Sequence, residues 1–222
     1  MKNTSLKERS LNLDTHLKDI KAPKPILSHR RETELSNRQR DLLDQLGVLF
    51  NKGFSNLTMA DIAKTLNCSL RTLYSLAPSR DELVLIVIER NLWSVGRSAM
   101  SAIKPEMKPL EAIRTYLQAA NIAVAGTTEA FAKDLEKVTS AQKLSEEHSA
   151  YLISVTKCLL DLSIEQGEIE PVDTVAIARL MAGIGRDFSR PEVVGSLSSS
   201  PKHSADEALD VVIAGLISSK KT

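Results

Sequence analysis

Three predicted helices fall within residues 36–76, and the turn between the second and the third spans only a few residues. The first begins at a capping box made by Ser36 and Gln39. Thr58 is placed to cap the second. The third is only about two turns long, because Pro78 stops it, and a helix this short is marginal without neighbours to hold it. This spacing predicts a helix-turn-helix arrangement.

The rest of the chain repeats apolar residues at helical spacing and shows no alternation typical of strands. A capping box at Ser79–Glu82 begins a long helix that extends to about residue 103, and a second box at Ser204–Glu207 begins the last helix. We therefore predict an all-α fold, in which a three-helix N-terminal domain over residues 36–79 is followed by a helical bundle over residues 80–222.

Residues 1–35 form a polar N-terminal extension of mixed charge, interrupted by the turn-forming run KAPKP. This composition favours a flexible tail. The alternative is a basic arm that lies along a nucleic-acid backbone, since positive charge without much order is sufficient for that role.

The chain has 222 residues, 42% of them hydrophobic, and only two cysteines, Cys68 and Cys158. The cysteines match no metal-ligand or redox spacing, so we expect each to pack as a small hydrophobe, although a redox role for Cys68 stays open. No apolar run has the length of a membrane span, and the first twenty residues lack a signal-peptide core. We expect a soluble, cytoplasmic protein with no metal or cofactor.

Enzymatic motifs are not found in the sequence. It has no Ser-His-Asp arrangement, no phosphate-cradling glycine loop and no paired His and acid motif with metal spacing. The four histidines are scattered, and two of them lie in the N-terminal extension. We therefore expect a binding protein rather than an enzyme.

The third predicted helix divides its residues between two tasks. Leu73 can face the three-helix core, which leaves other side chains outside on a helix of the right width for the DNA major groove. Arg71 can pair with guanine and Leu70 can pack on a thymine methyl, whereas Thr58, Thr72, Tyr74 and Arg80 suit phosphates. The residues that we expect at double-stranded DNA are Thr58, Ser69, Leu70, Arg71, Thr72, Tyr74, Ser75 and Arg80.

Residues 57–83, LTMADIAKTLNCSLRTLYSLAPSRDEL, resemble the helix-turn-helix of the TetR family of bacterial transcriptional regulators. The similarity rests on the threonine that opens the second helix, the Ile62-Ala63 pair, the Ser-x-x-Thr-Leu-Tyr run from Ser69, and the motif from Pro78 to Leu83. It extends over about residues 39–89. The family usually has glycine at Asn67, which can also adopt a left-handed conformation. It usually has a large aromatic residue at Ala77, where Leu76 can supply the packing.

This resemblance implies a homodimer that binds a palindromic operator, acts as a repressor and is released by a small-molecule effector. It implies a dimer interface on the two last long helices, formed by Ile177, Leu180, Met181, Ile184, Leu209, Val212, Ile213 and Leu216, although these apolar stripes can equally be ordinary core. It implies an effector cavity lined by Tyr116, Asn121, Phe131, His148 and Tyr151, each of which can instead be a core or surface residue. The alternative function is a ligand- or protein-binding module on the same fold that no longer binds DNA specifically.

Overall fold

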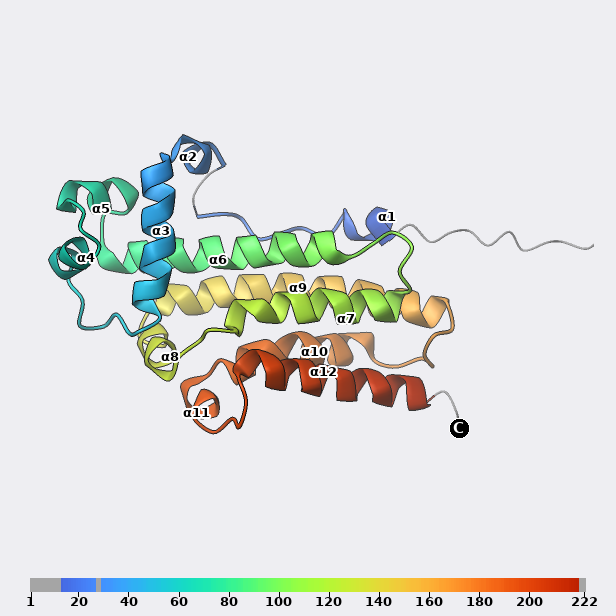
Figure 1. Ribbon diagram of the computed structural model, residues 1–222. Coiled ribbons are helices and arrows are strands. Elements are labelled where there is room, and N and C mark those ends of the chain that lie inside the picture. The colour runs from blue at the N-terminus through green and yellow to red at the C-terminus, as the bar shows by residue number, and fades with distance from the viewer. Residues whose placement is uncertain (1–12, 27–28, 220–222) are drawn as a thin grey trace, which may run out of the picture.

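The computed structural model describes residues 13–26 and 29–219, and every regular element in these ranges is a helix (Figure 1). The helices are α1 (Leu13–Leu17), α2 (His29–Glu34), α3 (Asn37–Phe50), α4 (Met59–Thr65), α5 (Leu70–Leu76), α6 (Arg80–Ala102), α7 (Pro109–Ala120), α8 (Glu129–Leu135), α9 (Thr139–Glu165), α10 (Thr174–Phe188), α11 (Pro191–Val194) and α12 (Pro201–Ser218), with one 3-10 helix, η1 (Asn121–Val124). The predicted all-α fold is confirmed. Within the described ranges, no helix combines the length and apolar character needed to cross a membrane.

The N-terminal helices α3, α4 and α5 gather around one hydrophobic core together with the start of α6. Ser36, Thr58, Ser69 and Ser79 each accept a hydrogen bond from a backbone N–H three residues further on. The sequence predicted three of these caps, and the cap at Ser69 is added by the structure. The helix boundaries in this part of the chain are therefore set by local hydrogen bonding as well as by packing.

A second core lies among α6, α7, α9, α10 and α12, the long helices that run alongside one another in Figure 1. The last of these begins at Pro201 rather than at the predicted Ser204. Its cap is Ser200, whose hydroxyl accepts from the backbone N–H of His203, and Pro201 suits the first helical position because it lacks an N–H.

The two cores are joined by α6, which belongs to both. The α3–α4 loop also contacts α8, whose Phe131 and Leu135 pack against the N-terminal core. The Asp134 carboxylate on α8 accepts hydrogen bonds from the backbone N–H groups of Phe54 (2.6 Å) and Ser55 (2.8 Å) and from the Ser55 hydroxyl. Lys137 also contacts it, at 3.1 Å. Burial acts to raise the pKa of Asp134, but these hydrogen bonds outweigh it and hold the pKa well below the usual range.

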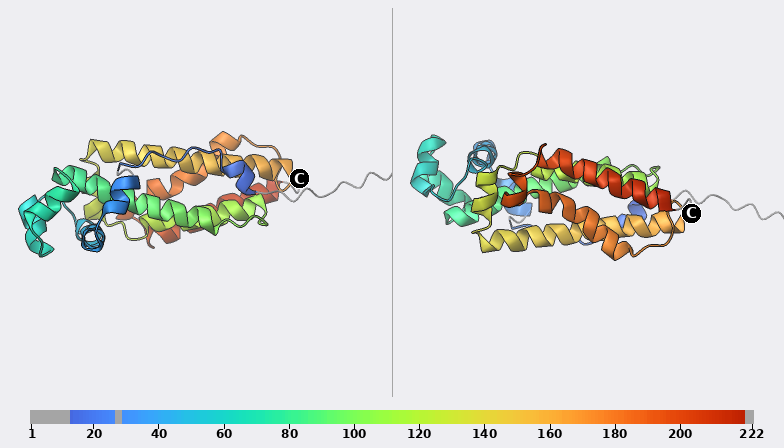
Figure 2. Two further views of the ribbon diagram at one scale, coloured as in Figure 1. Left: turned by 90° about the horizontal axis from the view of Figure 1, so that it is seen from above. Right: turned by 90° about the horizontal axis from the view of Figure 1, so that it is seen from below.

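The N-terminal extension differs from the flexible tail and the free basic arm considered above. Leu13 and Leu17 of α1 are buried in the bundle core, at 0% and 4% exposure, and Ile20 packs against the same core. The chain then runs in extended form along α6 and α9 toward α2 (Figure 2, left). We call residues 13–26 the strap. Apolar residues spaced along an otherwise polar segment anchor it. The part of the predicted tail before Leu13 lies outside the described residues.

Candidate nucleic-acid interface

The turn between α4 and α5 depends on one left-handed residue. Asn67 has a φ of +48°, as its place in the sequence predicted, and the backbone N–H of Cys68 bonds to the carbonyl of Ala63 at 2.9 Å. Ala77 is fully buried at the end of α5, and Leu76 is 3% exposed in the same core. Leucine thus contributes apolar packing beside the position where the family usually has an aromatic ring.

Helix α5 buries one side and exposes the other. Leu73 and Leu76 lie in the N-terminal core, whereas Leu70 is 43% exposed and Tyr74 53% exposed. Arg71 is exposed between them and makes no hydrogen bond or ion pair with the residues that the structure describes. A leucine and a tyrosine this exposed leave apolar surface in water, which is typical of a binding surface.

The hydroxyl groups of the predicted interface bond mainly to their own helices. Ser69 Oγ lies 2.8 Å from Thr72 Oγ1, and Ser75 Oγ donates to the Thr72 carbonyl at 2.7 Å. The Thr58 hydroxyl donates to Asp61 at 2.5 Å, and this bond is the main cause that lowers the pKa of the Asp61 carboxyl. These bonds hold the starts of α4 and α5 in place.

Arg80 is already engaged within the chain. Its guanidinium donates to the Ser55 carbonyl at 2.8 Å and to Asp81 at 2.9–3.0 Å, so it ties the α3–α4 loop to the start of α6. The sequence identified Arg80 only as a phosphate contact. A phosphate role for Arg80 stays a prediction.

Two further basic residues flank α5 and were missed in the sequence. Arg38 on α3 is exposed and close enough that its charge acts on the Cys68 thiol, whose pKa is nevertheless raised by burial. Lys64 is exposed near the end of α4. Both stand on the polar side of an amphipathic helix, and this position could have identified them as possible phosphate contacts.

The residues predicted at the dimer interface divide into two groups. Met181, Leu209, Ile213 and Leu216 are at most 7% exposed in the chain's own core, and Ile177 and Val212 pack against that core. The four buried residues are accounted for by ordinary core packing, the alternative that the sequence left open, whereas an interface role for the half-buried Ile177 and Val212 stays a prediction. Leu180 is 54% exposed and Ile184 is half-buried. Val211 on α12, which is not among the predicted interface residues, is 72% exposed.

The five predicted effector contacts are not all brought together. Phe131 packs edge-on against Phe54 in the N-terminal core, with ring centroids 5.9 Å apart, and the Asn121 amide donates to Asp206 at 2.9 Å. Tyr116 and Tyr151 share the bundle core, and His148 lies one turn before Tyr151 on α9. These three form a group that Phe131 does not join.

Sequence comparison finds no match, because no family model and no curated protein is detectably similar to this chain. Solved structures are similar in fold. A TetR transcription regulator from Haloarcula marismortui has a TM-score of 0.69 at 12% identity, with 82% of this chain and 99% of that chain covered. A TetR-like transcriptional regulator from Rhodococcus sp. has a TM-score of 0.61 at 22% identity, over 82% of this chain and 97% of that one.

A second structure from Rhodococcus sp., of a protein described as a putative TetR-family transcriptional regulator, has a TM-score of 0.65 at 15% identity. The similarity covers 82% of this chain and 100% of that one. Identity this low supports a shared fold rather than a shared binding specificity. The chain has the fold of the TetR-family transcriptional regulators.

Proposed function

We propose that this protein is a transcriptional regulator that binds a palindromic DNA operator as a homodimer, acts as a repressor and is released by a small-molecule effector. The observation that carries the proposal is the surface of α5. A short helix is held by the N-terminal core, and Leu70, Arg71 and Tyr74 point away from that core. An arginine can pair with guanine and a leucine side chain can pack on a thymine methyl in the major groove.

The dimer is supported by the outer surface of α10 and α12, which lie next to each other at the edge of the bundle (Figure 2, right). Leu180 and Val211 are the most exposed large apolar residues on these two helices. Gly183 and Gly215 have open space where a side chain would stand, so a second copy can approach closely there. Exposed apolar side chains beside small residues favour a symmetric helix-on-helix contact.

The effector is supported by the route from the bundle to α5. Helix α6 begins directly after α5 and extends through the bundle core, and Asp134 links α8 to the α3–α4 loop. A ligand that alters the packing of α6 can therefore change the position of the recognition helix. It must bind the DNA-incompetent state more tightly, because equal affinity for both states shifts nothing.

A mobility-shift titration tests the DNA-binding role. The DNA is the region upstream of the protein's own gene, and a scrambled sequence of equal length and composition is the control. We expect a discrete complex on the first DNA at concentrations that leave the scrambled DNA free. Equal binding to both, or none to either, would favour the alternative of a ligand- or protein-binding module that does not read DNA.

A further inference from the structure

One segment of the chain is anchored in both hydrophobic cores. Leu13 and Leu17 of the strap are buried in the bundle core, and Leu35, just past the end of α2, is 8% exposed in the N-terminal core. Figure 1 shows α1 beside the bundle and α2 beside the start of α3. The strap and α2 therefore join the two cores by a path separate from α6.

The strap is attached to both α9 and α6. The His16 carbonyl of α1 accepts a weak hydrogen bond from the Cys158 thiol of α9 at 3.8 Å, and Ile20 packs against the bundle core. At the other end of the strap, the backbone N–H of Ile26 donates to the Glu89 carboxylate of α6. Glu89 is 3% exposed, and a buried carboxylate requires hydrogen-bond donors, so this bond favours one position of the strap on α6.

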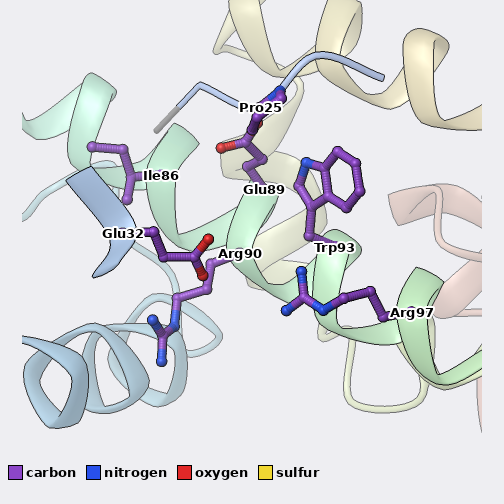
Figure 3. Close-up of a pocket in the computed structure, with 7 residues that line it drawn as sticks. All are labelled: Pro25, Glu32, Ile86, Glu89, Arg90, Trp93 and Arg97. Atoms are coloured by element: carbon purple, nitrogen blue, oxygen red, sulfur yellow. The ribbon is translucent and has the colours of Figure 1, made fainter. Parts of the chain in front are cut away.

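The strap meets α2 at a hollow of about 170 Å³ on α6. Pro25 of the strap and Glu32 of α2 both line it, and Figure 3 shows them beside Glu89 and Arg90 of α6, respectively. Residues 27 and 28 alone separate the strap from α2, and three peptide units span at most about 11 Å between Cα atoms. Fixing the end of the strap on α6 therefore limits how far α2 can move.

The start of α3 links α2 to α5. The Arg40 guanidinium donates to the carbonyl oxygens of Glu32 and Thr33, at 3.5 and 3.3 Å. The side-chain amide of Gln39, which completes the capping box of α3, donates to Ser75 Oγ on α5 at 3.2 Å. Contacts therefore run from the bundle core through the strap, α2 and α3 to the helix proposed to read DNA.

Helix α3 is held at both ends. At its C-terminal end, the Asn51 carbonyl accepts a hydrogen bond from the hydroxyl of Thr128, the residue that caps α8. At its start, Arg40 bonds to α2, and Figure 1 shows α2 and α8 at opposite ends of α3. A helix fixed at one end can pivot about that end, so α2 supplies a restraint that α8 does not.

We propose that the strap, acting through α2, fixes the orientation of the N-terminal helices α3, α4 and α5 relative to the bundle and thereby positions α5 for DNA. A restraint of this kind limits the orientations that the free protein can adopt, so less conformational freedom is lost when α5 enters a groove. Positioning of α5 for DNA rests on the proposed function, whereas the orientation of the N-terminal helices is a property of the protein without DNA.

The first test lengthens the connection between the strap and α2. Gly-Gly-Ser-Gly-Gly-Ser is inserted after Ile26, which adds about 20 Å of reach and removes no packed side chain. The matched control carries the same insertion after Ser198, an exposed residue in the loop before α12. Both proteins should keep the melting temperature of wild type, because the side chains of the two cores are unchanged.

Double electron–electron resonance measures the orientation without DNA. Nitroxides are placed at two exposed positions, Lys64→Cys on α4 and Lys143→Cys on α9. The native cysteines are replaced by Cys68→Ser and Cys158→Ser, and dilution with unlabelled protein keeps each nitroxide pair within one chain. We expect the strap insertion to widen the distance distribution about twofold and the control insertion to leave it as narrow as in wild type. In unlabelled protein, the strap insertion should weaken operator binding about three- to tenfold, measured by fluorescence anisotropy.

A pair of point substitutions tests the bond to Glu89 independently. Ile26→Pro removes the backbone N–H that donates to Glu89, whereas Ile26→Ala keeps it and shortens the same side chain. We expect Ile26→Pro to widen the distance distribution and to weaken operator binding about two- to fivefold, and Ile26→Ala to behave as wild type.

A distance distribution as narrow after the strap insertion as in wild type would overturn the inference. So would a widened distribution with unchanged operator affinity, because the strap would then order the N-terminal helices without positioning α5. If wild type bound no operator, the proposed function would fail, and the distance distribution alone would decide whether the strap fixes the N-terminal helices.

Discussion

A substitution at Arg71 should affect base recognition without affecting folding. Its side chain is exposed and makes no contact that stabilises the described structure, so Arg71→Ala should leave the melting temperature unchanged. We expect it to weaken specific operator binding by about 1–3 kcal/mol and to relax the preference for one base pair. Fluorescence anisotropy on the operator and on single-base variants measures both effects.

The matched control for Arg71→Ala is Lys104→Ala, an exposed basic residue just past the opposite end of α6. It should leave affinity and base preference unchanged. If Arg71→Ala bound every operator variant as wild type does, Arg71 would be removed from the base-reading set.

Single residues also show which interactions can be predicted from a sequence. The left-handed turn at Asn67 and the caps at Ser36, Thr58 and Ser79 could be predicted because each depends on neighbours within three residues. The partners of Arg80 could not, since Ser55 is 25 residues away and reaches it only in the folded chain. The same limit applies to the unpaired hydroxyl of Tyr116, which the sequence presents as an ordinary helical tyrosine.

At the scale of elements, the periodicity of apolar residues located the helices. It did not determine which partner each apolar face packs against. The stripe of Leu209, Ile213 and Leu216 fits either a dimer interface or the chain's own core by its spacing, and in the structure these residues lie inside the protomer. The strap was missed because Leu13 and Leu17 are too few to form a helical pattern, although they anchor it. Apolar spacing predicts that a residue is buried without saying against which partner.

The contact between α8 and the α3–α4 loop gives a prediction about stability. Asp134→Asn keeps the shape of the side chain and removes its charge, so the bonds from Phe54, Ser55 and Lys137 weaken. We expect the free energy of unfolding at pH 7 to fall by about 1–3 kcal/mol, measured by urea denaturation. Asp44→Asn, at an exposed carboxylate, should change it little.

The difference in the free energy of unfolding between wild type and Asp134→Asn should depend on pH in one direction. The pKa of Asp134 is lower in the folded chain than in the unfolded chain, where an aspartate has a pKa of about 3.9. Its stabilisation is therefore complete above that value and is lost as the pH falls toward the folded pKa. The gap between wild type and Asp134→Asn should narrow below about pH 4. A gap that widened in acid would contradict the proposed role of the carboxylate.

At the scale of the whole molecule, the exposed surface of α10 and α12 predicts the assembly. Leu180→Glu with Val211→Glu should convert a dimer to a folded monomer, since both side chains are more than half exposed in the protomer. Leu216→Glu should instead unfold the chain, because that residue is buried. Sedimentation velocity and circular dichroism separate the two outcomes.

The matched control for the dimer is Val48→Glu, at an exposed valine on α3 that is 67% accessible. It should leave the dimer intact. A folded dimer after the double substitution would place the interface elsewhere.

A symmetric dimer also determines the symmetry of its operator. The two copies of α5 must meet major-groove faces about 34–36 Å apart, or a multiple of that distance, so the operator should be a near-palindrome.

Coupling between effector and operator is the last consequence of the whole assembly. Helix α6 begins directly after α5 and extends into the bundle core, so an effector that alters the packing of α6 should change the spacing of the two recognition helices. Linkage of this kind amounts to about 1–3 kcal/mol, or 5- to 150-fold in affinity, and it acts equally in both directions. Saturating operator DNA should therefore weaken effector binding by the same factor by which the effector weakens operator binding. Calorimetric titration of the free dimer and of the operator complex with the effector measures one factor, and anisotropy of the operator with and without the effector measures the other. Equal effector affinity in the free protein and in the complex would exclude effector-controlled release and leave a DNA-binding protein that this effector does not control.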